Sequence, residues 1–124
     1  MLTDAEIDRG KKEAPRYADK LHEHNDCVRI AYEWLDAQMK TKGATKKIRA
    51  VKHIIESWGG RYVSTDDVQV AAWLHPEIRG TYPYYNISAR LTRPSTKRLM
   101  TISEADKHTH YRDRYQDCYA VEES

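Results

Sequence analysis

The sequence predicts a mainly α protein with a small β component. Three stretches, 27–39, 48–58 and 65–75, carry apolar residues at helical spacing and are bounded by residues that begin or end helices. Only short stretches, such as 61–64 and 95–102, have an extended character. At 124 residues the chain has the length of about one domain, so it can bury a core without disulfides or metal ions.

The N-terminal region is predicted to be helical. Thr3 and Glu6 form a capping-box pattern that begins a short helix, and Gly10 or Pro15 ends it. A second helix is expected from Pro15 through "RYADKLHEH". The next helix has the clearest amphipathic pattern and closes at Gly43. Its predicted apolar face consists of Cys27, Ile30, Ala31, Trp34, Leu35 and Met39.

The middle of the chain adds two further helices. The first stops at Gly59-Gly60, and its apolar stripe consists of Ile48, Val51, Ile54, Ile55 and Trp58. The second, "STDDVQVAAWLH", begins with hydroxyl and acidic residues that suit a helix N-terminus. Its predicted inner face consists of Val68, Ala71, Ala72 and His75, and His75 is interpreted as a core histidine with a hydrogen-bond partner. Trp34, Trp58 and Trp73 are all interpreted as core residues.

Charge is segregated along a chain whose net charge is only +2. Residues 78–102 contain five basic residues and no acidic one, and Tyr82, Tyr84 and Tyr85 lie among them. Residues 103–124 contain six acidic residues and three basic ones. Such asymmetry indicates an electrostatic surface for a nucleic acid, or else a solvated basic face that has no partner.

The order of the elements in the middle of the chain points to a family. A helix in "KKIRAVKHIIESW" is followed by Gly-Gly, "YVS", the helix "TDDVQVAAWLH", and the phrase "NISARLTRPSTKRLMTI". This order resembles a winged helix-turn-helix domain of the small bacterial or phage regulator type, over roughly residues 44–102. The resemblance implies a recognition helix followed by a basic β-hairpin wing. It divides the chain into an N-terminal helical extension (1–43), a winged-helix core (44–102) and a C-terminal helix or arm (103–124).

Residues 84–93 admit two interpretations. As a helix they would place Tyr85, Asn86, Ala89, Arg90 and Arg93 on the outer face. As a strand, an apolar set at positions 85, 87, 89 and 91 alternates with a polar set at positions 86, 88, 90 and 92. The helix is favoured because the preceding elements require a recognition helix at this point.

The expected function is sequence-preferring binding of double-stranded DNA, as a transcriptional regulator or accessory factor. Asn86, Arg90 and Arg93 are predicted to contact bases, since Asn and Arg side chains pair bidentately with adenine and guanine. Phosphate contacts are predicted for Tyr85, Lys46, Lys47, Arg79 and Thr65, and for Lys97 and Arg98 in the wing. The N-terminal helices are expected to offer a homodimer interface, which would set two recognition helices about one DNA turn apart.

The alternative is a non-enzymatic inhibitor or adaptor that binds another protein, such as a phage counter-defence protein. Tyr and Arg also dominate the energetic centres of protein interfaces, so the same surface would serve. An enzyme is not expected, since the sequence has no phosphate-binding Gly loop, nucleophile elbow or HExxH motif.

No metal ion and no cofactor are predicted. The two His-x-His pairs near Cys27 and Cys118 would each offer one good ligand, because helical residues two apart point to different faces. The two cysteines follow no CxxC pattern, which favours reduced residues of a cytoplasmic protein. No apolar stretch reaches membrane-spanning length, so no membrane association is expected.

Overall fold

The N-terminal helix begins where the capping-box pattern predicts. A computed structural model describes residues 1–15, 23–45 and 50–124, and its first helix is α1 (Asp4–Glu13). The Thr3 hydroxyl accepts from the backbone N–H of Glu6, and the Glu6 carboxylate accepts from the backbone N–H of Thr3. The helix continues through Gly10 and ends before Pro15. The helix expected after Pro15 falls largely on residues 16–22, outside the described residues.

The most amphipathic stretch forms α2 (Asn25–Ala37), as predicted. All but one of the residues predicted for its apolar face are buried: Cys27, Ile30, Ala31, Trp34 and Leu35. The helix ends at Ala37 and not near Gly43, so Met39 lies beyond it and is exposed. The C-cap residue is Gln38. Its side-chain amide donates to the carbonyl oxygen of Thr92 and accepts from the backbone N–H of Thr92.

The two helices of the middle region are confirmed. The first, α3 (Val51–Gly59), buries its predicted apolar stripe from Val51 to Trp58, whereas Ile48 lies outside the described residues. Gly60 closes the helix with φ of +61°, which favours glycine. The second, α4 (Thr65–Leu74), begins with the Ser64 hydroxyl accepting from the backbone N–H of Asp67. His75 at its end is buried; its Nδ1 accepts from the backbone N–H of Glu77, and its Nε2 donates to Asp36 at 2.8 Å, so the prediction of a satisfied core histidine is confirmed.

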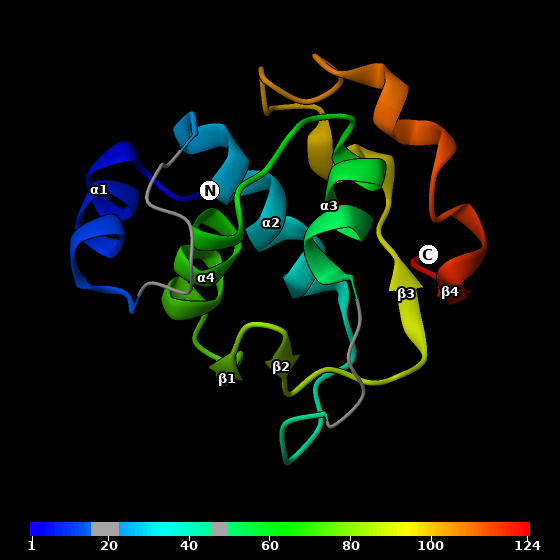
Figure 1. The fold of residues 1–124 in the computed structure, drawn as a ribbon, viewed down its shortest axis with the longest axis horizontal. Helices are drawn as coiled ribbons and strands as arrows, with labels where there is room; N and C mark the ends of the chain where they lie inside the picture. The colour runs from blue at the N-terminus through cyan, green and yellow to red at the C-terminus, as the bar shows by residue number, and fades with distance from the viewer. Residues whose placement is uncertain (16–22, 46–49) are drawn as a thin grey trace.

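The helices pack around α2. Figure 1 shows α2 in the middle of the molecule, with α1 and α4 on one side and α3, β3 and β4 on the other. The helix α4 contacts both α1 and α2, and it is buried along most of its length because it lies between neighbours. In the described residues, helices dominate a small mixed domain with two short sheets, so the coarse fold class is confirmed.

The predicted recognition helix over residues 84–93 is wrong. The strand β1 (Gly80–Thr81) pairs antiparallel with β2 (Tyr84–Tyr85), and a separate strand, β3 (Leu91–Arg93), follows. Gly80 adopts φ of +104°, and a Cβ there would lie 2.2 Å from the Tyr84 carbonyl oxygen, so the turn requires glycine. The alternating pattern does not hold throughout either: only positions 84–85 and 91–93 are strand, Asn86 and Thr92 are buried, and Ala89 is exposed.

The β-hairpin wing expected in residues 95–102 is also wrong. These residues form a 3₁₀ helix, η1 (Thr96–Leu99), and β3 pairs in parallel with β4 (Tyr119–Glu122) near the C-terminus. The stretch predicted as a C-terminal helix or arm contains β4 and two further 3₁₀ helices, η2 (Thr109–Asp113) and η3 (Gln116–Cys118). The β3–β4 pairing thus joins the predicted core, 44–102, to the predicted arm, 103–124.

Candidate functional site

Asn86, the predicted adenine-reading residue, is buried, with 4% of its surface exposed. Its Oδ1 accepts from the backbone N–H of Arg79 at 2.6 Å. Its Nδ2 donates to the carbonyl oxygens of Glu77 at 3.0 Å and Thr41 at 3.3 Å. The amide therefore fastens three backbone segments together. The expectation of an outward-facing Asn86 is corrected because a buried amide binds the backbone here and is not available to a base edge.

Two further predicted contact residues lie in the interior. Tyr85 is fully buried, and its hydroxyl donates to Oε1 of Gln69 on α4. Burial raises the pKa of the Tyr85 phenol well above its ordinary value. Thr65 is buried as the first residue of α4. The prediction of phosphate contacts for Tyr85 and Thr65 requires exposed hydroxyls, so it does not fit this structure.

Arg98 lies in a cluster of carboxylates that are distant in sequence. Its guanidinium donates to Glu33 at 2.8 Å and Asp36 at 3.0 Å on α2, and to Glu123 at 2.6 Å after β4. We call these four side chains the Arg98 clamp. The basic stretch 78–102 contains no acidic residue, but the fold brings carboxylates to it from α2 and from the segment after β4. A phosphate contact by Arg98 would have to replace these ion pairs.

Arg93, the last residue of β3, contacts the C-terminal segment of the chain. Its guanidinium lies 5.3 Å from the centre of the Tyr119 ring and donates to the side chain of Gln116. A longer ion pair of 4.0 Å connects it to Glu122. Arg93 is therefore half-buried against the C-terminal strand, and it does not lie on the outer face of a helix as predicted.

Three of the predicted contact residues have exposed side chains: Arg79 before β1, Arg90 before β3 and Lys97 in η1. In residues 1–15, 23–45 and 50–124, no carboxylate forms an ion pair with any of the three. They belong to separate elements, and the structure does not bring them onto one helix. Lys46 and Lys47, which were predicted to contact phosphates, lie outside the described residues.

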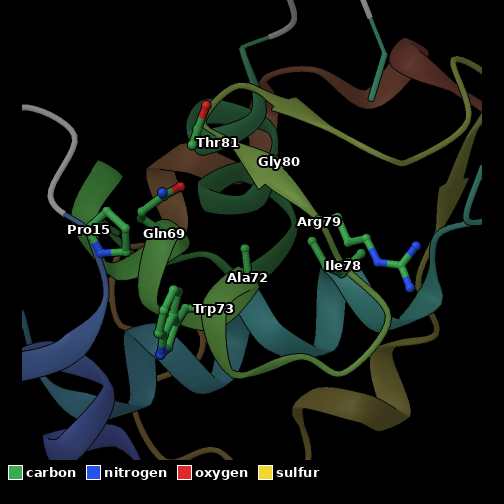
Figure 2. A pocket seen from close by; sticks show the side chains of 8 residues that line it. All are labelled: Pro15, Gln69, Ala72, Trp73, Ile78, Arg79, Gly80 and Thr81. Carbon is green, nitrogen blue, oxygen red and sulfur yellow. The ribbon is translucent and has the colours of Figure 1, made fainter. Parts of the chain in front are cut away.

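A pocket that the sequence analysis missed lies between α4 and the segment leading into β1. Its volume is about 300 Å³, and Figure 2 shows the residues that line it: Pro15, Gln69, Ala72, Trp73, Ile78, Arg79, Gly80 and Thr81. Trp73 is 52% exposed, so the prediction that it packs in the core is wrong. The signal was present, because at 3.6 residues per turn Trp73 falls on the opposite side of α4 from the stripe through Val68 and Ala71.

The pocket combines an apolar wall with hydrogen-bond donors. Trp73, Ala72 and Ile78 supply apolar surface, and the Arg79 side chain extends from the segment beside them (Figure 2). Gln69 is 6% exposed and lies between Pro15 and Thr81. Concave apolar surface with a few placed polar groups is typical of binding sites. The residue types and their arrangement suit binding, and the described lining residues include no acid, cysteine or histidine that could act as a nucleophile or general base.

Comparisons with known proteins identify no relative. The chain matches no family model, no curated protein and no solved structure. In the described ranges no three His, Cys, Asp or Glu side chains are grouped so that they could hold a metal ion. None of the helices described has the length and apolar composition that a bilayer crossing requires.

Proposed function

We propose that this protein binds another protein, as a non-enzymatic inhibitor or adaptor. The observation that carries the proposal is the exposure of Trp73 beside a pocket that Arg79 also lines. Trp and Arg are the residue types most enriched among the side chains that dominate protein–protein affinity, especially where they border a pocket. A partner that covers the Trp73 ring and the adjoining pocket would remove their apolar surface from water.

A photo-crosslinking experiment tests this proposal. With a photoreactive phenylalanine analogue at position 73, irradiation in the native cells is expected to give a discrete adduct with another protein. The same analogue at position 100 is the control, since Met100 is more exposed than Trp73 and lies away from the pocket. A nuclease-sensitive adduct would indicate nucleic acid instead, an adduct of twice the chain mass would indicate a homodimer, and no adduct at position 73 would contradict the proposal.

Trp73→Ala is expected to weaken binding of the crosslinked partner by about 30-fold, the typical effect of removing an energetically dominant Trp. The free energy of unfolding should change by less than about 1 kcal/mol, because the side chain is half exposed. Titration of the purified partner, together with urea unfolding, measures both quantities. Equal affinity of wild type and variant would remove Trp73 from the interface.

Binding of duplex DNA is a second candidate function. Its support is the exposure of Arg79, Arg90 and Lys97 in a stretch without acidic residues, since unpaired cations can neutralise phosphates. Replacing Arg79, Arg90 and Lys97 together by alanine is expected to lower the salt dependence of binding to a random-sequence duplex. The slope of log affinity against log salt should fall by about 3, roughly one unit per lost contact. Lys12→Ala, an exposed cation on α1, is the control and should keep the slope. Absence of duplex affinity at low salt would exclude this candidate.

The winged-helix interpretation belongs to this second candidate. Its support is the succession of α3 and α4 through a short connection, which matches the first two helices of the middle region that the resemblance implies. Because residues 84–93 contain β2 and β3, the contacts proposed here are phosphate contacts by exposed cations and involve no recognition helix. A homodimer through residues 1–43, a regulatory role and a cytoplasmic location are further parts of the same proposal, and sedimentation velocity tests the homodimer.

A further inference from the structure

We infer that the pocket between α4 and β1 binds an acidic linear segment of a partner protein. The segment would place an apolar side chain against Trp73, give a carbonyl or carboxylate oxygen to Gln69, and pair an acidic side chain with Arg79. This inference rests on the proposed protein-binding function and specifies the chemistry of the partner.

The orientation of the Gln69 amide is fixed by its neighbours. Its Oε1 accepts two hydrogen bonds, one of 3.0 Å from the backbone N–H of Tyr82 and one from the hydroxyl of Tyr85. Rotating the amide by half a turn would place its N–H groups against these donors, so the oxygen must face the hairpin. The Nε2 therefore points the other way, toward the Pro15 side of the pocket (Figure 2).

The Nε2 group of Gln69 is a donor without an acceptor. In the described part of the chain no oxygen accepts a hydrogen bond from it, and it is not among the fully buried side-chain atoms that lack a partner, so the group is open to solvent in the pocket. An amide donor that faces a pocket can be matched by a carbonyl or carboxylate oxygen of a ligand, which would take the place of solvent there. This donor favours ligands that carry an acceptor at one end.

The rest of the pocket selects an apolar group. Trp73, Ala72 and Ile78 contribute apolar side chains to the lining, and Figure 2 shows Ala72 between the other two. A volume of about 300 Å³ accommodates one or two side chains and is too small for a folded domain. A short extended segment that inserts one apolar side chain fits these dimensions.

Charge selects an acidic segment. Arg79 is exposed at the rim, and no ion pair neutralises it within the described residues. Among the described lining residues Arg79 is the one ionisable side chain, so the lining carries positive charge. A nucleic acid backbone would be expected to meet several converging cations, whereas this pocket offers one cation and one neutral amide.

The probe for this inference is a displayed library of random 12-residue peptides, selected on wild type and counter-selected on Trp73→Ala. We expect enriched peptides in which an apolar or aromatic residue lies within a few positions of Asp or Glu. The synthesised peptide should shift the side-chain N–H signals of Gln69 in an NMR titration. Gln69→Glu keeps an acceptor for Tyr82 and Tyr85 but presents an oxygen to the pocket, so it should weaken binding by at least tenfold.

A double-variant cycle tests the predicted ion pair. Changing the peptide acid to its amide should weaken binding to wild type by at least fivefold and to Arg79→Ala by less than twofold, since the pair is then already lost. Thermal unfolding confirms that each variant is folded. Enriched peptides without acids, no enrichment at all, or peptides that bind Trp73→Ala as well as wild type would overturn the inference. If crosslinking at position 73 still finds a protein in those cases, the protein-binding function stands and only the acidic segment is rejected.

Discussion

Asn86→Ala is expected to lower the free energy of unfolding by about 3 kcal/mol, because it leaves buried backbone groups without partners. The three groups are the N–H of Arg79 and the carbonyls of Glu77 and Thr41, which approach the Asn86 amide at 2.6, 3.0 and 3.3 Å. They come from the hairpin, the end of α4 and the loop after α2, so their separation would loosen the whole region around β1 and β2. Urea unfolding measures the loss.

Two further variants make this prediction specific. Asn86→Asp keeps the acceptor for Arg79 but turns an oxygen toward the two carbonyls, so it should destabilise about as much as alanine does. Arg90→Ala removes an exposed side chain from the same predicted recognition surface and should change the free energy of unfolding by less than about 0.5 kcal/mol. If Asn86→Ala keeps full stability and loses only DNA affinity, the buried position of Asn86 is wrong.

The helices of this fold could be predicted from sequence because their signals are local. The apolar stripe of α2, the Thr3 capping box and the glycine at position 60 each act within a few residues of the element that they define. The local sequence does not determine the secondary structure of residues 84–93, because these ten residues fit both the helical and the alternating pattern. The strand β3 is decided by partners elsewhere: β4 on one side and the Gln38 side chain on the other.

The candidate site was predicted less well than the fold, for the same reason. The acid-free stretch is visible in the sequence. The three carboxylates that surround Arg98 come from elements distant in sequence, so the charge pattern of the stretch does not indicate them. Nor could it show that the amide of Asn86 is used within the protein. The position of Trp73 off the apolar stripe of α4 was a local signal of exposure, and it was outweighed by the general tendency of Trp to be buried.

Arg98→Ala is expected to lower the free energy of unfolding by about 2 kcal/mol at pH 7. The change leaves Glu33, Asp36 and Glu123 facing one another without their shared cation, and partial solvent exposure of the clamp limits the cost. Arg98→Lys should recover only part of the loss, because one ammonium group cannot reproduce the geometry of the guanidinium. Lys97→Ala, in the same 3₁₀ helix but exposed, is the matched control and should change stability by less than about 0.5 kcal/mol.

The effect of Arg98→Ala should also depend on pH. The hydrogen bond from Arg98 is the main reason that the pKa of Glu123 lies below its ordinary value of 4.5. Burial acts to raise the pKa of Asp36, but hydrogen bonds from His75 and Arg98 outweigh it and lower the pKa below 3.8. Because both pKa values are lower in the folded protein, the unfolded chain takes up protons first as the pH falls. The stabilisation by the clamp is therefore complete at neutral pH and is lost progressively below about pH 5.

The difference in stability between wild type and Arg98→Ala should accordingly shrink between pH 7 and pH 3, whereas Lys97→Ala should follow the wild-type profile. Urea unfolding at several pH values measures the difference directly. A loss that is equal at pH 7 and pH 3 would show that Arg98 stabilises the protein through packing of its side chain and not through the carboxylates, since only the latter lose their charge in this range.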